Sequence, residues 1–253
     1  MNDLAVAKNQ VRYEQKAYWR NPMAAVFTLM FPVVFLVVVG TSAGSSLVPG
    51  TTLAYSQYVV VAMLTFGLIA ACYTNLGMTI CLRRDSGVLK RMRGTPISIG
   101  SYMGGIIGSV IINVALLTVL VVGIGMVFYH LHFPYHLLAV LLTLFIGIVT
   151  FCALGMAVTI LVTNADAAPA VINGIYFPIV FISGVFYPLS NGSVLSRIAD
   201  YFPVRHLIIA LVHAFERGPG SGLRVHDLTV MLLWAAGALF FTARRFRWEP
   251  RRH

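Results

Sequence analysis

The chain has 253 residues, of which 58% are hydrophobic and only 10% are charged. Average soluble domains are close to half apolar and about a quarter charged, so this composition excludes an ordinary soluble domain and a disordered chain. The formal net charge is +10 and the mean hydropathy is +0.84, which together favour an integral membrane protein with basic flanking segments.

Residues 1–21 are predicted to form an amphipathic helix that lies at the membrane surface. Cations recur at every fourth position from Lys8 to Arg20, and Tyr18 and Trp19 are of the type favoured at headgroup level. Because the apolar face of this segment is weak, a solvated helix with some basic residues is the alternative.

Residues 21–82 contain no Asp, Glu, Lys or Arg, and they hold two apolar blocks, Met23–Val39 and Tyr55–Leu82. Each block is long enough to cross the hydrocarbon core of a bilayer. The segment between them, with Pro49 followed by Gly50, is predicted to be a loop. Asn21 before Pro22 is typical of an N-cap followed by proline at the first helical position, so the first span is predicted to begin there.

Four more spans are predicted downstream. Residues 94–165 are again free of Asp, Glu, Lys and Arg, and they contain Ile97–Phe128 and Tyr135–Val162, which should form an antiparallel hairpin. The fifth span is predicted at Ala167–Tyr187 and the sixth at Leu228–Thr242, with Asp227 as its N-cap.

The predicted fold is therefore an all-α membrane protein with six transmembrane helices in one domain, residues 1–253. Residues 22–187 hold spans one to five, residues 227–243 hold span six, and residues 244–253 form a basic tail. Lys and Arg cluster beside the spans, which by the positive-inside rule places both termini in the cytoplasm of a bacterial plasma membrane. Cations beside apolar spans also argue for membrane lipids and against nucleic acid as a partner.

Residues 188–226, between spans five and six, are predicted to be external. Their apolar stretch Leu207–Phe215 is too short to span, and a seventh span would move the basic tail outside. The sequence favours a re-entrant or interfacial helix, and an amphipathic element on the outer surface fits it, with Arg205, His206 and His213 around the helix.

Several chemical functions are excluded by missing motifs. None of the lysines, Lys8, Lys16 and Lys90, follows a glycine, so no P-loop is present and the chain does not hydrolyse nucleotide by that route. No pair of carboxylates or nucleophile motif occurs in the spans, which argues against a membrane enzyme. The cysteines Cys72, Cys81 and Cys152 lack C-x-x-C spacing and are predicted to be buried.

Two weaker patterns remain. His130, His132 and His136 cluster at a predicted outer turn, where interfacial side chains are expected and a metal site is the alternative. Ser101, Gly105 and Ser109 recur at four-residue spacing, which predicts a face on which another helix packs closely.

Residues 83–96, between spans two and three, read Arg-Arg-Asp-Ser-Gly-Val-Leu-Lys-Arg-Met-Arg-Gly-Thr-Pro. This segment resembles the charged-x-Gly-x-Leu-basic segment, ending in Thr-Pro, of the type-2 ABC exporter permeases, which include antibiotic-resistance exporters of the daunorubicin type. Asp85 stands where glutamate is common in that family. The positions that the resemblance assigns to a loop coupled to an ATPase are Arg83, Arg84, Asp85, Gly87, Val88, Leu89, Arg91, Thr95 and Pro96.

A second match lies at the end of span five. Residues 181–188 read Phe-Ile-Ser-Gly-Val-Phe-Tyr-Pro, which is similar to the external F-x-S-G-x-x-x-P motif of the same family, and a downstream Phe-Pro pair follows. The positions that match this external motif are Phe181, Ser183, Gly184, Pro188 and Pro203.

The resemblance implies a permease that moves an amphipathic drug, a lipid or a glycan precursor. It also implies a separate ABC ATPase subunit in two copies, which would hold ATP and Mg²⁺, and a second permease half, identical or homologous; no cofactor is expected on this chain. The alternative is a secondary carrier or channel without an ATPase, although the spans offer few of the ionisable groups it would need. Aromatic candidates for a substrate path are Phe27, Phe31, Phe66, Tyr73, Tyr176 and Phe177.

Overall fold

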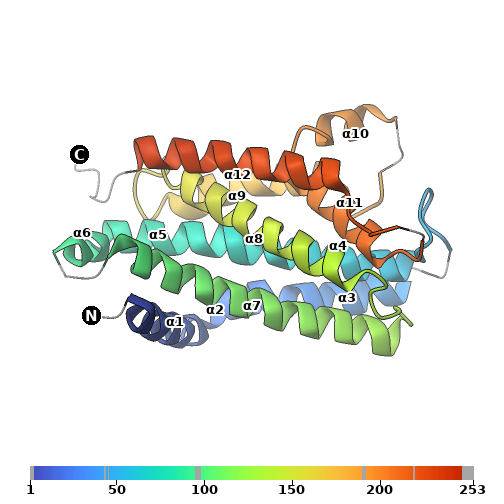
Figure 1. Cartoon of the computed structure of the whole chain (residues 1–253), viewed down its shortest axis with the longest axis horizontal. Helices are drawn as coiled ribbons and strands as arrows, with labels where there is room; N and C mark the ends of the chain where they lie inside the picture. Colours follow the sequence, from blue (N-terminus) through green and yellow to red (C-terminus); the bar gives the residue numbers. More distant parts are fainter. Residues whose placement is uncertain are drawn as a thin grey trace.

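The computed structural model describes residues 3–42, 44, 46–94, 98–189, 192–218 and 220–246. Throughout these residues the regular elements are helices and no strand occurs, which confirms the all-α prediction (Figure 1). In chain order they are α1 (Asp3–Trp19), α2 (Pro22–Ala25), the π-helical segment η1 (Val26–Met30), α3 (Phe31–Ser42), α4 (Tyr55–Ile69), the π-helical segment η2 (Ala70–Asn75), α5 (Leu76–Asp85), α6 (Val88–Arg93), α7 (Ile99–Phe128), α8 (Leu137–Val158), α9 (Ala168–Ile182), α10 (Val194–Ala199), α11 (Pro203–Phe215) and α12 (Val225–Arg245).

Four helices are long and apolar enough to cross a membrane, and they run side by side along the bundle (Figure 1). These four are the continuous helix Tyr55–Asp85, then Gly100–Phe128, Leu137–Val158 and Val225–Arg245. The chain is therefore an integral membrane protein. The other two predicted spans correspond to shorter apolar helices, Thr28–Ser42 and Ala168–Ile182, so the six-span count stays a prediction.

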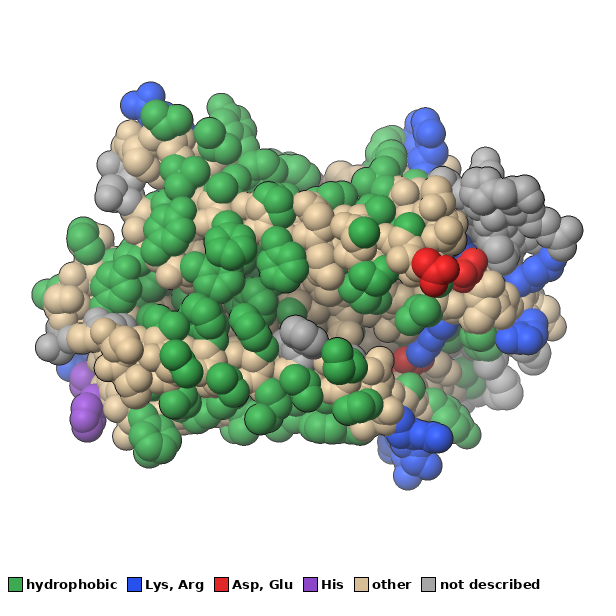
Figure 2. Space-filling view, turned by 180° about the vertical axis from the view of Figure 1, so that it is seen from behind, with side chains coloured by type: hydrophobic (Ala, Val, Ile, Leu, Met, Phe, Trp, Pro, Cys, Tyr) green, Lys and Arg blue, Asp and Glu red, His purple; other side chains and the backbone are tan. Residues whose placement is uncertain are grey.

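The central helix of the bundle is α4, in which every residue from Tyr58 to Ile69 is buried. A helix that is apolar all round is expected in the middle of a bundle, whereas helices at its edge face lipid on one side. Accordingly α7 and α12 expose large apolar side chains such as Val119 and Leu233. Figure 2 shows hydrophobic side chains over the middle of the molecule and most of the visible Lys and Arg near one end.

Helix α1 crosses the bundle near the end where α6 lies, and its coil is seen almost end-on in Figure 1. It packs on the small residues of α7: a Cβ atom at Gly105 would lie 2.4 Å from Cβ of Gln10, and one at Gly108 would lie 2.8 Å from Val11. Gln15 donates a hydrogen bond from Nε2 to the Ser109 hydroxyl at 2.9 Å. The prediction of a close-packing face on this span is confirmed, and its partner is α1.

Helix α11 corrects the prediction of an amphipathic element on the outer surface. Its residues are almost all buried, and it packs against α4, α8 and α12. Arg205 is 7% exposed and His206 is 4% exposed, so two of the three polar residues that suggested a surface helix are inside the protein, whereas His213 is exposed. The sequence pattern was misleading because these polar groups face partners on other segments rather than water.

The partner of His206 is Asp227, which lies in the first turn of α12 and is not its N-cap as predicted. His206 Nδ1 lies 2.6 Å from Asp227 Oδ1, and its Nε2 lies 2.8 Å from the carbonyl oxygen of Asp200. Both ring nitrogens face oxygen atoms, an arrangement that favours the doubly protonated form of the ring. Burial alone would lower the pKa of His206, but these hydrogen bonds raise it above its ordinary value.

We predict that α1 docking depends on Gly105, since adding side-chain atoms to a filled contact destabilises a protein. Gly105→Val should lower the free energy of unfolding by about 1–3 kcal/mol and lower the thermal midpoint in detergent. The matched control is Gly104→Val on the same helix, because Gly104 is exposed and nothing lies within 4 Å of its Cβ position. Equal effects of the two substitutions would show that α1 packing does not depend on this contact.

Candidate functional site

The segment between α5 and α7 contains the short helix α6, at the end of the bundle where α1 crosses (Figure 1). Gly87 precedes it with φ of 71°, a left-handed conformation that favours glycine and lets the chain reverse after α5. Leu89 is fully buried and anchors α6 to the bundle, whereas Arg91 is exposed. Thr95 and Pro96 of the predicted coupling loop lie outside the described residues.

Arg84 points into the protein, where it holds the end of α8. Its Nη1 donates to the carbonyl of Thr159 at 2.8 Å and its Nη2 to that of Val162 at 2.6 Å, and the residue is only 4% exposed. These carbonyls follow the last turn of α8, where backbone acceptors lack helical partners and a cation is favourable. Arg84 therefore fixes α5 to α8 and presents no surface to an outside partner.

Asp85 continues the same attachment. Its Oδ2 accepts a hydrogen bond from the backbone N–H of Ala165 at 3.2 Å, in the turn that leads from α8 to α9. Val88 is half-buried at the start of α6. The beginning of the predicted coupling loop is thus tied to the connection between α8 and α9.

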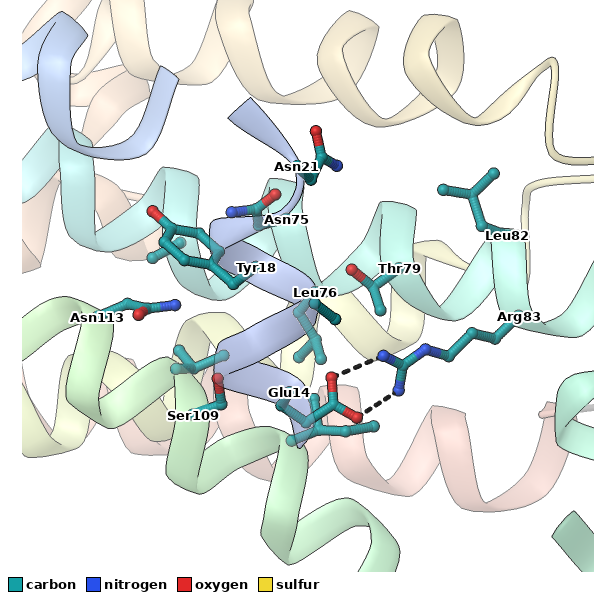
Figure 3. Close-up of a pocket in the computed structure, with 14 residues that line it drawn as sticks. Glu14, Tyr18, Asn21, Asn75, Leu76, Thr79, Leu82, Arg83, Ser109 and Asn113 are labelled. Atoms are coloured by element: carbon teal, nitrogen blue, oxygen red, sulfur yellow. Dashed lines mark hydrogen bonds and ion pairs between the residues drawn. The ribbon is translucent and has the colours of Figure 1, made fainter. Parts of the chain in front are cut away.

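Arg83, the neighbour of Arg84, points toward α1 and forms a bidentate ion pair with Glu14 (Figure 3). Both nitrogen–oxygen distances are 2.6 Å, and Arg83 also donates to the Tyr102 hydroxyl at 2.9 Å. Glu14 accepts a further hydrogen bond from Gln10 at 2.7 Å. Since the Glu14 side chain is only 8% exposed, the pair is desolvated. Removing one partner would leave the other as a buried charge without a counter-charge.

A polar cavity of about 200 Å³ lies beside this ion pair, between α1, η2, α5 and α7 (Figure 3). Asn75 on its wall donates from Nδ2 to the hydroxyl of Thr28 at 3.0 Å, which joins the two π-helical segments η1 and η2. π-helical turns inside α-helices occur often at functional sites. Across the bundle, Gly155 of α8 makes room for η2, because a Cβ there would lie 2.7 Å from the carbonyl oxygen of Cys72.

The external motif forms the turn that ends α9. Gly184 has φ of 90°, and its carbonyl accepts a hydrogen bond from the Tyr58 hydroxyl. Ser183 is fully buried and its hydroxyl bonds back to the carbonyl of Ile179, whereas Phe181 is exposed. Pro188 is half-buried, and Pro203 begins α11, where a proline lacks no helical hydrogen bond.

The candidate path residues are brought together in one chain of rings. Ring centroids lie 5.1 Å apart between Phe31 and Phe66, and 5.9 Å apart both between Phe66 and Tyr176 and between Tyr176 and Tyr73. Phe177 continues the chain at 5.3 Å from Tyr176. These separations are in the range where aromatic pairs attract each other. The side chain of Phe27 lies outside the described residues.

Among the described residues, one group of possible metal-ligating side chains occurs, and it does not include the cluster of His130, His132 and His136. His206, His226 and Asp227 place possible ligand atoms within 4.8 Å of one another. Both ring nitrogens of His206 lie within hydrogen-bond distance of oxygen atoms, at 2.6 and 2.8 Å, so a metal ion would have to replace one of these contacts. The predicted outer turn containing His130 is present, and His130 itself adopts φ of 50° there.

Two residues of the site were missed by the sequence analysis. Glu14 was given no role within the predicted surface helix of residues 1–21, yet it is buried against Arg83. The sequence feature that could have indicated this buried role is that Glu14 is the only carboxylate between Lys8 and Arg20. Gln15 was also missed, because an uncharged side chain in a polar helix carries no distinguishing pattern.

Comparison with known proteins gives one family. A family model described as ABC-2 type transporter matches residues 8–215 of the chain. This range includes α6, the ion pair of α1 with α5, the external turn and α11. No curated protein matches the sequence.

We predict that Glu14 and Arg83 act as a unit. Glu14→Gln should lower the free energy of unfolding by about 3 kcal/mol, because it leaves the Arg83 guanidinium without a counter-charge. The double variant Glu14→Gln with Arg83→Met should cost less than the sum of the single variants, measured as unfolding midpoints in detergent. The control is Arg12→Gln on the exposed side of α1, expected within about 0.5 kcal/mol of the native chain. Additive costs would contradict a coupled pair.

Proposed function

The chain belongs to the ABC-2 type transporter family, and we propose that it is the membrane-spanning permease of an ATP-driven exporter in the bacterial plasma membrane. The ATPase is a separate subunit, present in two copies, that holds ATP and Mg²⁺. A second permease half, identical or homologous, completes the transporter. This chain carries transport and no ATPase activity of its own, in keeping with its lack of a P-loop lysine.

The observation that carries the proposal is the mounting of α6. The side chain of Leu89 on α6 is buried. The residues just before α6 hold the base of this helix against α1 and α8, and they are Arg83, Arg84 and Asp85. Lys90 and Arg91 are on its exposed side. A short, charged helix that is held firmly at its base is suited to being displaced by a partner subunit and to transmitting that displacement to the bundle. We assign the docking surface to the exposed residues of α6, and the anchoring role to Arg83 and Arg84.

Coupling to ATP follows from the free energies of two states of the transporter. ATP shifts the equilibrium between them only by as much as its binding to the ATPase differs between the two. Because α5 is tied to both α1 and α8, a displacement of α6 moves three helices together. The chain of rings from Phe31 to Tyr73 lies on α3, α4, η2 and α9, and it provides an apolar path for an amphipathic drug, a lipid or a glycan precursor.

The proposed topology has six spans and both termini in the cytoplasm. Residues 22–42 are helical without a break through α2, η1 and α3, which at 1.5 Å per residue is enough for about 30 Å of hydrocarbon. Helix α9 with the turn that follows it forms the fifth span. This arrangement puts α1 and α6 on the cytoplasmic side, and α10 and α11 on the outer side, in agreement with the positions of the basic clusters.

We predict opposite labelling at the two ends of the molecule. Ser221→Cys should react with an impermeant thiol reagent added to intact cells, and Ser86→Cys should react only after the membrane is opened. Both serines are exposed, and the native cysteines are all buried, so the background is low. Labelling at Ser86→Cys in sealed cells would overturn the proposed orientation.

We predict that charge reversal on α6 separates the permease from its ATPase. Arg91→Glu should reduce recovery of a P-loop-containing subunit with the tagged chain by about tenfold or more, which corresponds to about 1.4 kcal/mol at the interface. Permease-stimulated ATP hydrolysis should fall in parallel.

The matched control for this experiment is Arg217→Glu. Arg217 is exposed near the far end of α11, so it undergoes the same charge change away from α6. Full recovery and stimulation in Arg91→Glu would remove α6 from the interface. Failure of the native chain to recover any P-loop subunit would favour a carrier or channel that works without an ATPase.

A further inference from the structure

A second polar cavity, of about 210 Å³, lies at the end of the bundle away from α1 and α6. It is enclosed by the loop before α4, the turn after α9 and one side of α11. Its wall contains both polar and apolar side chains. They include Thr51, Tyr58, Arg205, Ile209, Glu216 and Arg224.

Arg205 lies on the wall of this cavity, and its Nε is buried there without a hydrogen-bond acceptor. The residue is 7% exposed, and its Nε has no hydrogen-bond partner. Its ion pair in the described part of the chain is with Asp200, at 3.5 Å from Nε to Oδ1, which is too long and poorly aligned for a hydrogen bond. The Asp200 side chain is 55% exposed, so water screens much of its charge. Burying a guanidinium with an unsatisfied donor costs free energy of folding unless another group binds it.

The other carboxylates around α11 are engaged elsewhere. Glu216 accepts a hydrogen bond from the backbone N–H of Thr52 at 3.0 Å and pairs with His213. Asp227 is held by His206 and by Nε of Arg224 at 2.9 Å. No further side-chain acid from the described residues lines the cavity. Among the described residues, the half-exposed Asp200 is thus the one carboxylate paired with Arg205, which leaves the guanidinium able to bind a further anion.

The backbone is shaped to place this guanidinium. A Cβ atom at Gly184 would lie 3.0 Å from Nη1 of Arg205, tighter than ordinary contacts allow. Gly184 thus gives Arg205 room, in addition to supplying the left-handed turn after α9. Arg224, whose side chain is 46% exposed, adds a second guanidinium to the wall, and Ile209 adds an apolar side.

We propose that this cavity binds a phosphate-class oxyanion, with Arg205 as its principal ligand and Arg224 as a second cation. The planar guanidinium matches two oxygens of a phosphate at once, a geometry that lysine does not offer. A cavity with a cationic end and an apolar side suits the headgroup of an anionic lipid, and a free phosphate ion shares the same chemistry. The site lies away from α6 and is distinct from the chain of rings.

The test measures thermal unfolding of the purified full chain in neutral detergent. Phosphatidylglycerol in mixed micelles, and inorganic phosphate in a separate series, are the probes, with phosphatidylcholine as the uncharged comparison. Near saturation we expect the anionic probe to raise the midpoint by about 3–6 °C. A shift with phosphatidylglycerol alone identifies a lipid headgroup, whereas a shift with both identifies a site for the free ion; either result supports the site.

Variants at Ile209 keep the test independent of folding defects. Ile209 is half-buried on the cavity wall four residues after Arg205, so Ile209→Glu would place a carboxylate at helical i,i+4 spacing from the guanidinium. This variant should keep or raise the midpoint without a probe and lose the probe-dependent shift. Ile209→Gln and the exposed Arg197→Gln should keep the shift. No shift in the native chain with either probe, or an undiminished shift in Ile209→Glu, would overturn the proposal.

Discussion

Two consecutive arginines at the end of α5 determine how this end of the molecule is built. Successive side chains on an α-helix point about 100° apart, so Arg83 and Arg84 reach different neighbours. Arg83 pairs with Glu14 of α1, and Arg84 binds the carbonyls that follow α8. Neither guanidinium can be left unpaired in a desolvated position without a large free-energy cost. Helices α1, α5 and α8 are consequently held together by charge, although apolar packing alone would let them slide.

In the transporter that we propose, this arrangement would connect a movement of α6 to the rest of the bundle. A packed network changes between discrete arrangements and does not deform continuously. α6 follows α5 directly, so the contacts of Arg83 and Arg84 lie next to it along the chain, and the hydrogen bond between Asn75 and Thr28 that joins η2 to η1 lies further along the same continuous helix. The chain of rings that includes Phe66 and Tyr176 lies beyond these contacts along the same helices.

The sequence predicted the helical class and most helix positions because long apolar blocks bounded by charge have few alternatives in a membrane. The close-packing face on α7 followed from its small residues. What the sequence could not predict is which polar residue meets which. Helix α11 illustrates this: the apolar run ending at Phe215 indicated a surface helix, since nothing near His206 in the sequence shows that Asp227, on another helix, folds against it. The buried role of Glu14 depends in the same way on Arg83, which lies far away in the chain.

Arginines at the two ends of the bundle are buried to a similar degree, yet they differ in what surrounds them. Arg84 is 4% exposed and donates to two carbonyl oxygens, whereas Arg205 is 7% exposed and its ion-pair partner, Asp200 at 3.5 Å, is largely exposed to water. Burial of a cation is tolerated in the first case because the fold supplies the acceptors. In the second case the fold supplies the space, through the missing side chain of Gly184, but leaves the buried Nε of Arg205 without a hydrogen-bond acceptor. A glycine that fits both a left-handed turn and the approach of a guanidinium links the external turn after α9 to α11. That link makes the orientation of Arg205 a property of the fold, and it presents the guanidinium to the cavity in which we propose that an oxyanion binds.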